Sequence, residues 1–469
     1  MEFHVSLTDR RDLAGQIYRQ LREAILDGRL RVGEALPPTR ELARRLDVAR
    51  NTVSVAYERL TAEGFLESRV GAGTFVHEGG PASRSAPAES PLRPRPVWRS
   101  ISPWPDWLDQ RPRFDFRVGL PDHRLFPYEA WRRLTARELR RPAEPVYGDP
   151  AGHPDLRAAV ARYIGVSRAV RASAGDIIVT SGIQQALDLI ARVLLDPGDH
   201  VAVEAPGYAP ARMLFQSLGL RVTGVPVDAE GLRVDALPHD ARAVYVTPSH
   251  QFPLGMPMSL ARRTALLAWA DRHDAAVIED DYDSEFRFGG RPIEPLQNLD
   301  HRGRVLYVGS FSKVLVPRLR VGFLVAPASL HAALCAAKYV TDWHAPVPTQ
   351  AALARFIDEG LLARHVRRTR QEYERRHELI TTTLRRDFAD RLELVPSAAG
   401  LHVSAFTAGD PAPVLERARS AGVEARTLAE VAKDPSTAPG IALGYGAIPT
   451  DLIGEGLRRL RVAWDADPD

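Results

Sequence analysis

The sequence has one cysteine, very few lysines and no long apolar run. Cys335 cannot form an intrachain disulfide, and no apolar stretch approaches the roughly 18 to 20 residues that a membrane-spanning helix needs. The first residues, MEFHVSLTDRRD, lack the basic and apolar segments of a secretory signal. These absences argue against membrane and extracellular classes of protein, and we expect a cytoplasmic one.

Lysine is rare although the chain is rich in basic residues. Arginine supplies nearly all of the 62 basic side chains, and the only lysines are Lys313, Lys338 and Lys433. The arginine excess is typical of a coding bias and by itself indicates no function. Chemistry that needs a lysine amine therefore has three candidates. The length of 469 residues exceeds that of one ordinary domain and favours two or more cores.

Residues 11–77 predict a compact helical unit that ends in a hairpin. Apolar residues recur at helical spacing before a pair of short strands that glycines punctuate. Thr39 is a candidate N-cap of the second helix, and the third helix is expected to begin at Asn51 or Thr52 and to end at Gly64. Two short helices joined by a tight turn can enter a major groove, with the third helix of the unit reading the bases.

Candidate DNA contacts lie on the second and third predicted helices and at the tip of the hairpin. Guanidinium, amide and hydroxyl groups there can meet base edges or phosphates, and a glycine-rich tip fits closely against a minor groove. The alternative is a solvated helix face, because acidic residues nearly match the arginines in this unit. The predicted contacts are Arg40, Arg44, Arg50, Asn51, Thr52, Arg69, Gly71 and Gly73.

The composition changes twice along the rest of the chain. Residues 78–113 are rich in proline, serine and arginine, which predicts an exposed linker. From residue 114 to 469, short apolar runs alternate with amphipathic stretches; the runs are DIIVT, HVAVEA, LRVTGVPV, AVYVT, AAVIED, RVLYVGS and VGFLVA. This alternation predicts a three-layer α/β domain with a largely parallel sheet, followed by a smaller C-terminal α/β subdomain.

Residues between 180 and 322 supply the groups that a Schiff-base cofactor requires, namely a lysine amine, an acid for a pyridine nitrogen and donors for a phosphate. Lys313 follows the strand RVLYVG, at the strand end where ligands bind in open α/β sheets; the alternative is a surface lysine. Asp280 follows the strand AAVIE, and strand alternation points Asp281 the opposite way, so only one can serve. Tyr282 is positioned to hydrogen-bond a phenolic ring oxygen.

A phosphate is expected where the strand DIIVT turns into the next helix, since backbone amides there face an anion. Arg320 can add a bidentate clamp, while Tyr208 can stack on a ring or simply pack in the core. The alternative is that the turn only starts a helix. We expect no metal site. The further phosphate candidates are Ser181, Gly182, Ile183, Gln184, Ser310 and Ser312.

Both predicted domains resemble known families. The segment RQLREAILDGRLRVGEALPPTRELARRLDVARNTVSVAYERLTAEGFLESRVGAGTFV resembles the GntR-type winged helix-turn-helix. The segments YGDPAGHPDLRAAVARYI, TSGIQQALDL, EAPGYAPAR, IEDDYDSEF and GSFSKVLVPRLRVGFLV resemble fold-type I aminotransferases, and the fusion is similar to the MocR subfamily of GntR regulators. The resemblance implies a head-to-tail homodimer that binds operator DNA and pyridoxal 5'-phosphate.

The resemblance also implies roles for individual residues. It makes Lys313 the Schiff-base lysine, with Asp280 as the partner of the pyridine nitrogen and Tyr282 as the partner of the phenolate. Arg320 becomes a phosphate ligand, and Tyr147 matches a tyrosine that reaches the phosphate in the partner subunit.

Two departures from the enzyme pattern favour a regulator. Working aminotransferases commonly carry Asn-Pro-Thr-Gly where this chain has FPLG at 252–255. They also typically place an arginine that binds the substrate carboxylate where this chain has Ala442, and Arg426 is a candidate replacement. We expect a regulator that senses pyridoxal phosphate, or an amino acid or amine that reacts with it. The alternatives are an aminotransferase with a fused DNA-binding head and a regulator that has lost the cofactor.

Overall fold

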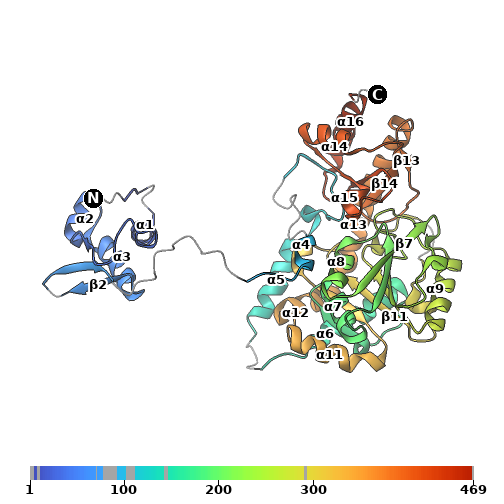
Figure 1. Cartoon of the computed structure of the whole chain (residues 1–469), viewed down its shortest axis with the longest axis horizontal. Helices are drawn as coiled ribbons and strands as arrows, with labels where there is room; N and C mark the ends of the chain where they lie inside the picture. Colours follow the sequence, from blue (N-terminus) through green and yellow to red (C-terminus); the bar gives the residue numbers. More distant parts are fainter. Residues whose placement is uncertain are drawn as a thin grey trace. The chain divides into compact units, whose positions relative to one another are not determined.

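The computed structural model describes residues 5–7, 11–69, 71–77, 92–101, 111–141, 146–289 and 293–466. The chain divides into two compact units, Met1–Arg95 and Pro96–Asp469 (Figure 1). Most of the predicted linker, 78–91 and 102–110, lies outside the described residues. Within the described ranges, no helix combines the length and the apolar character needed to cross a membrane.

The first unit is a three-helix bundle closed by a small antiparallel sheet. Its core is built from residues with almost no exposure, including Ile17, Leu21, Val53 and Leu60. The sheet order is β1-β3-β2. The elements are α1 (Leu13–Leu26), β1 (Ala35–Leu36), α2 (Thr39–Arg45), α3 (Arg50–Ala62), β2 (Leu66–Arg69) and β3 (Gly73–Val76). This is the predicted helical unit with its hairpin.

The ends of α2 and α3 differ in detail from the prediction. Thr39 is the first residue of α2 and not its N-cap, which is Pro38 and makes no side-chain capping bond. The Thr39 hydroxyl instead accepts a hydrogen bond from Nε of Arg50 at 3.3 Å. Helix α3 begins one residue earlier than predicted, at Arg50. Gly64 lies just past α3 with φ +78°, a left-handed conformation that glycine adopts without strain.

The second unit is built around an eight-stranded sheet of order β5-β12-β11-β10-β9-β6-β7-β8. The central strand pairs β11–β10, β10–β9, β9–β6 and β6–β7 are parallel, and the pairs at the two edges are antiparallel. This confirms the predicted, largely parallel sheet. The strands are β5 (Ile177–Thr180), β6 (His200–Ala205), β7 (Arg221–Asp228), β8 (Gly231–Leu232), β9 (Ala241–Val246), β10 (Ala276–Asp281), β11 (Val305–Ser310) and β12 (Gly322–Val325).

Helices cover both faces of this sheet because its strands bury side chains on both sides. Ile178 and Leu306 pack with α7, α8 and α11 on one face, while the adjacent residues Ile177 and Tyr307 pack with α6 and α12 on the other. The same second face is covered further along by α9 and α10. The layers are therefore helix, sheet and helix. The helices are α4 (Val97–Ser100), α5 (Tyr128–Leu139), α6 (Pro154–Arg168), α7 (Ile183–Leu194), α8 (Ala209–Ser217), α9 (Leu260–Arg272), α10 (Leu296–Leu299), α11 (Ala328–Thr341) and α12 (Val347–Asp358).

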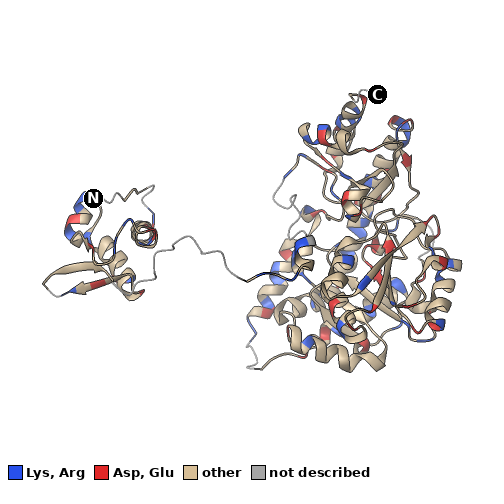
Figure 2. Cartoon of the chain, viewed as in Figure 1, with Lys and Arg blue, Asp and Glu red and all other residues tan. Residues whose placement is uncertain are grey.

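A smaller subdomain follows, as predicted. Its sheet has the order β13-β14-β17-β16, and a separate parallel pair joins β15 to β4 near the start of the unit. Basic and acidic residues are interspersed over the helices of the second unit (Figure 2). The elements are β4 (Phe114–Asp115), α13 (Leu361–Asp387), β13 (Glu393–Leu394), β14 (His402–Phe406), α14 (Ala412–Ser420), β15 (Val423–Glu424), β16 (Arg426–Thr427), α15 (Leu428–Ala432), β17 (Gly440–Gly444) and α16 (Thr450–Asp465). Short 3-10 helices are η1 (His123–Leu125), η2 (Ala174–Asp176), η3 (Val234–Ala236), η4 (Ser284–Phe286) and η5 (Pro317–Leu319).

Candidate functional site

A cavity of about 480 Å³, here called the Lys313 cavity, lies at the carboxyl ends of the central strands. Such strand ends are where open α/β sheets bind ligands. Three residues with predicted roles, Ser181, Gly182 and Tyr147, are not among its lining residues. The predicted residues that line it are Ile183, Gln184, Tyr208, Asp280, Tyr282, Ser310, Ser312, Lys313 and Arg320. The fold therefore gathers, around one cavity, side chains from four stretches of the sequence.

Lys313 projects into the cavity just after β11, and its Nζ donates a hydrogen bond to the carbonyl of Gly119 at 2.6 Å. Burial lowers the pKa of Lys313, against the opposing effect of the carboxylates of Asp283 and Asp280. A lowered pKa increases the neutral fraction of the amine, which is its nucleophilic form. Of the other lysines, Lys338 is fully buried and pairs with a carboxylate 2.6 Å away, whereas Lys433 is exposed.

Asp280, at the end of β10, presents a carboxylate with one free oxygen to the cavity. Its Oδ2 accepts a hydrogen bond from the Tyr245 hydroxyl at 2.6 Å, while its buried Oδ1 has no partner among the described residues. Burial raises the pKa of Asp280 to about 7. Asp281 lies on the other side of the sheet, where it pairs with Arg168 at 2.6 Å. The two carboxylates thus point in opposite directions, and the cavity receives one of them.

The N-terminus of α7 forms one end of the site together with Arg320. Gly182 is the N-cap with φ +85°, and a Cβ atom there would lie 2.8 Å from Nη2 of Arg320. That guanidinium donates a hydrogen bond to the carbonyl of Ser181. The Ser181 amide is already engaged, because it donates to Oε1 of Gln185 at 2.8 Å. Arg320, rather than the first amide of the turn, is therefore the donor available to an anion at this end.

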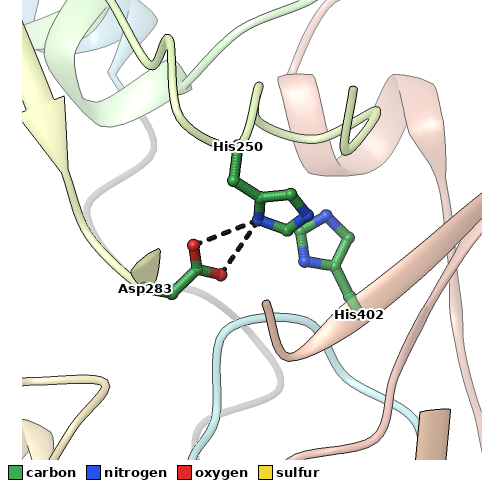
Figure 3. A group of neighbouring side chains, drawn as sticks. All are labelled: His250, Asp283 and His402. Carbon is green, nitrogen blue, oxygen red and sulfur yellow. Dashed lines mark hydrogen bonds and ion pairs between the residues drawn. The ribbon is translucent and has the colours of Figure 1, made fainter. Parts of the chain in front are cut away.

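A buried polar cluster that the sequence did not reveal adjoins Tyr282. The Tyr282 hydroxyl lies 2.9 Å from Nδ1 of His250, and the same nitrogen lies 3.0 Å from the carboxylate of Asp283 (Figure 3). His402 packs beside His250, and its Nε2 donates to the carbonyl of Pro253 at 2.8 Å. Burial lowers the pKa of His402 to about 3, so its imidazole is neutral near pH 7. The side-chain atoms of His250, Asp283 and His402 that could bind a metal ion lie within 4.8 Å of one another.

Of the two sequence departures from the enzyme pattern, Phe252 lines this cavity, whereas Ala442 is not among its lining residues. Phe252, in place of the enzymes' asparagine, lines it and packs edge-on against Tyr208 and Tyr282 with centroid separations of 5.8 and 6.0 Å. Arg426 on β16 is the register partner of Ala442 on β17 and also lines the cavity. Arg426 pairs with glutamates, but its buried Nε has no partner within the described part of the chain.

Other lining residues were missed because their signals are tertiary. Arg117 and Gly119 lie in a segment without a motif, between β4 and α5, that reaches the cavity only in the folded chain. Tyr245 lies inside the predicted strand AVYVT, where an aromatic residue is ordinary core. His402 begins β14 of the small subdomain. The only available signal for His250 was its position two residues before the FPLG segment.

Tyr147 lies away from the cavity. Its side chain is 70% exposed and stacks on Trp343 with a centroid separation of 3.9 Å. Its predicted contact with a partner subunit stays a prediction.

The predicted DNA contacts lie on the surface of the first unit. Arg40 and Arg44 are exposed on α2 and have no ion-pair partner among the described residues. Arg69 is committed to a salt bridge with Glu67 and lies over a phenylalanine ring. The remaining candidates are Arg50 and Asn51, which are exposed, Thr52, which is half-buried, and Gly71 and Gly73 at the hairpin tip, with φ of +79° and +117°.

Two family models match the chain. Residues 114–429 match aminotransferase class I and II, and residues 13–76 match the gntR family of bacterial regulatory proteins. The probable rhizopine catabolism regulatory protein MocR of Rhizobium meliloti is 39% identical, over 96% of this chain and 93% of that protein. The HTH-type pyridoxine biosynthesis transcriptional regulator PdxR of Corynebacterium glutamicum is 32% identical, over 93% of each.

Solved structures match the second unit. A Pyrococcus horikoshii kynurenine aminotransferase in complex with PMP is 29% identical with a TM-score of 0.71, covering 81% of this chain and 96% of that one. LysN, an α-aminoadipate aminotransferase from Thermus thermophilus complexed with N-(5'-phosphopyridoxyl)-L-leucine, is 32% identical with a TM-score of 0.68, covering 75% and 91%. The second unit thus shares the fold of enzymes whose structures hold pyridoxal phosphate derivatives.

Proposed function

Since this chain belongs to the MocR-type subfamily of GntR transcription regulators, in which a winged helix-turn-helix is fused to a fold-type I aminotransferase-like domain, we propose that it binds operator DNA under the control of pyridoxal 5'-phosphate. The cofactor itself, or an amino acid or amine that reacts with it, is the signal. We assign residues 11–77 to DNA binding, 78–113 to a linker and 114–469 to the cofactor, in a cytoplasmic protein.

The observation that carries the proposal is the free Oδ1 of Asp280 in the same cavity as Lys313 and Arg320. A buried carboxylate oxygen without a partner is costly, and a protonated pyridine nitrogen is the donor that would satisfy it. The amine of Lys313 would then lie at the aldehyde of the cofactor, and the guanidinium of Arg320 at its phosphate. The residues present therefore fit pyridoxal phosphate.

When bound, the cofactor supplies an aldehyde that reacts with amines and a ring that withdraws electrons. Lys313 provides the amine for that aldehyde, and Asp280 holds the proton on the ring nitrogen. Tyr282, whose hydroxyl contacts His250, would hydrogen-bond the ring oxygen. Tyr208, which lines the cavity, would stack on the ring. Phosphate donors would be Arg320, Ser310, Ser312 and, in the N-terminal turn of α7, Ile183 and Gln184. The amide of Ser181 would first have to leave Gln185.

An effector cannot use the arginine that binds the substrate carboxylate in the enzymes. It must therefore either carry no carboxylate or bind without that arginine. Ala442 removes the arginine that enzymes place on this strand, and Arg426 on the neighbouring strand brings a guanidinium to the same cavity. Because glutamates already pair with Arg426, an effector carboxylate would have to compete with them. The cofactor itself, which needs no such anchor, is the effector we favour.

We further propose that the regulator acts as a head-to-tail homodimer. Winged helix-turn-helix dimers read two half-sites, so a ligand that changes the placement of the two heads changes which operator spacing they fit. The contacts would be made by Arg40, Arg44, Arg50, Asn51, Thr52, Arg69, Gly71 and Gly73. Exposure of Tyr147 supports a role at the subunit interface.

The test compares wild type, Lys313→Ala and, as a matched control, Lys433→Ala after addition of pyridoxal phosphate. We expect a near-visible absorbance band in wild type and in the control but not in Lys313→Ala, together with altered operator affinity in a mobility-shift assay. A band that survives in Lys313→Ala, or operator affinity that ignores the cofactor, would overturn the proposal. Sustained keto-acid production would instead favour the aminotransferase alternative.

A further inference from the structure

A second and larger cavity, of about 650 Å³, lies apart from the Lys313 cavity. We call it the arginine groove. It runs between α6 and α13, with η4 and the end of α12 completing its wall. The turn after β10 separates the two cavities: Tyr282 and Asp283 line the first, whereas Ser284, Glu285 and Arg287 line the second. No residue of the cofactor site lines the groove.

The groove carries a large excess of positive charge. Five arginines line it, against the two acids Asp358 and Glu285. Two of the arginines are neutralised: Arg162 pairs with Asp358 at 2.5 Å, and Arg168 pairs with a buried aspartate. The other three, which make no ion pair with any residue that the structure describes, are Arg287, Arg367 and Arg370.

Arg287 shows that the groove lacks a counter-charge. Its Nε is buried and has no hydrogen-bond partner within the described ranges. Burial, and then the nearby guanidinium of Arg168, lower the pKa of Arg287. A guanidinium that is left half-desolvated without an acceptor is costly, and an anion beside it would remove that cost.

Glu285, the lining acid without an arginine partner in the groove, compensates little of this charge. Glu285 accepts a hydrogen bond from the Tyr163 hydroxyl at 2.9 Å, and burial, with the nearby charge of Asp281, raises its pKa to about 7. The carboxyl group of Glu285 is therefore partly protonated at neutral pH. Since Asp358 is already paired with Arg162, the unpaired guanidinium groups have no unengaged full negative charge among the lining residues of the groove.

We propose that the arginine groove binds a small organic polyanion, bearing phosphate or several carboxylates, through Arg287, Arg367 and Arg370. Guanidinium groups match such oxyanions with bidentate, charge-assisted hydrogen bonds. The volume falls within the roughly 300 to 1,000 Å³ of small-molecule sites. A DNA backbone would be held by the exposed Arg367 and Arg370 alone, whereas the buried Nε of Arg287 favours a ligand small enough to enter the groove.

The experiment measures binding of inorganic pyrophosphate to the full chain by calorimetry at fixed ionic strength, with chloride as the comparison anion. We expect saturable binding that weakens roughly tenfold or more in Arg287→Gln and in the double variant Arg367→Gln/Arg370→Gln. The double variant alters only exposed side chains of α13, so it keeps the test valid if Arg287→Gln fails to fold. Arg368→Gln, exposed on the same helix but outside the groove, should bind as wild type does.

Three results would overturn the proposal. Absence of saturable binding removes the site. Binding that is lost in Arg320→Gln, but kept in the groove variants, places the pyrophosphate in the Lys313 cavity. Displacement of pyrophosphate by duplex DNA of unrelated sequence makes the groove a DNA surface. Because none of these readouts uses the absorbance of the bound cofactor, failure here is distinguishable from failure of the proposed function.

Discussion

Glu204 carries a buried carboxylate at the end of β6 that is only partly satisfied. Its Oε2 accepts a hydrogen bond from the Thr247 hydroxyl at 2.6 Å, but Oε1 has no partner among the described residues. Burial raises the pKa of Glu204 from 4.5 to about 7. The proton is therefore held more tightly in the folded chain than in the unfolded one. The stability that this protonation contributes is fully present below the pKa of Glu204 in the unfolded chain. It is lost as the pH rises through the pKa of Glu204 in the folded chain.

Substitution of Glu204 by glutamine should flatten part of the pH dependence of stability. In wild type this single group lowers the free energy of unfolding by about 3 kcal/mol between acidic and alkaline pH. Denaturant unfolding of both proteins without cofactor at about pH 5 and about pH 8 measures the difference. We expect the stability of Glu204→Gln, relative to that of wild type, to be greater at about pH 8 than at about pH 5. Equal slopes for the two proteins would contradict the assignment.

Residues at strand ends could be predicted from the sequence, and residues brought in by tertiary structure could not. Lys313 and Asp280 follow apolar runs, so their place at the sheet edge follows from strand register. Arg117 and Gly119 reach the same cavity from a segment without periodicity, and no local pattern marks them. Which amide of the α7 turn is free also depends on a side chain, that of Gln185.

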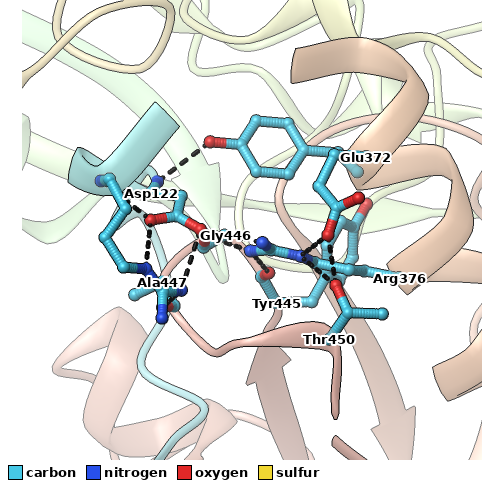
Figure 4. Close-up of polar contacts among 9 residues, drawn as sticks. Asp122, Glu372, Arg376, Tyr445, Gly446, Ala447 and Thr450 are labelled. Carbon is cyan, nitrogen blue, oxygen red and sulfur yellow. Dashed lines mark hydrogen bonds and ion pairs between the residues drawn. The ribbon is translucent and has the colours of Figure 1, made fainter. Parts of the chain in front are cut away.

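Helix α13 holds the small subdomain to the start of the unit through one buried guanidinium. Arg376 pairs with Asp122 at 2.8 Å and donates to the carbonyls of Tyr445 and Gly446 at 3.2 and 2.7 Å (Figure 4). The side chains of Arg376 and Asp122 are 3% and 2% exposed. Although burial opposes it, hydrogen bonds from Arg124 and Arg376 lower the pKa of Asp122. The carboxylate therefore stays charged and depends on its partners.

Arg376→Gln should destabilise the second unit by about 3 kcal/mol, because it removes one charged partner of a buried carboxylate and the donor to two carbonyls. Urea unfolding monitored by circular dichroism measures the loss. Arg386→Gln on the same helix is the matched control, since its pair with Asp387 is exposed and should contribute less than about 1 kcal/mol. Equal effects of the two substitutions would show that the buried network has no special weight.

The ends of helices and strands were less predictable than their existence. Each apolar run that the sequence marked as a strand forms one. For the strands that are buried on both faces, such as β5 and β6, burial leaves a strong local signal. The predicted N-cap of α2 was wrong by one residue: Thr39 is the first residue of the helix, and its hydroxyl accepts a hydrogen bond from Nε of Arg50. No spacing rule contains this tertiary contact.

The two units have separate cores. We therefore expect the second unit to bind the cofactor without the first. One cluster of buried residues lies entirely in the first unit, and the remaining clusters lie entirely in the second. A fragment of residues 96–469 should therefore fold and give the near-visible band with pyridoxal phosphate, while operator binding is lost. Absorbance and mobility-shift assays check the two halves of this expectation. A fragment that aggregates or stays colourless would mean that the second unit needs the first.

The fold class of the whole molecule followed from the change of period along the sequence, from helical spacing to apolar runs with helices between them. The arginine groove could not be predicted from the sequence, because its side chains come from α6, α13 and the turn after β10, which are far apart in the sequence.

The scarcity and placement of lysine also make this chain unusual as a target for acylating reagents. Lys338 is fully buried in an ion pair, which leaves Lys433 on the surface and Lys313 in its cavity as the side-chain amines within the described residues. With Lys313 occupied by the cofactor, activated esters should thus mark the side chains of the folded chain at Lys433. A fluorophore or a sensor surface can accordingly be attached to the second unit at one known point, without modifying the arginines that line the two cavities.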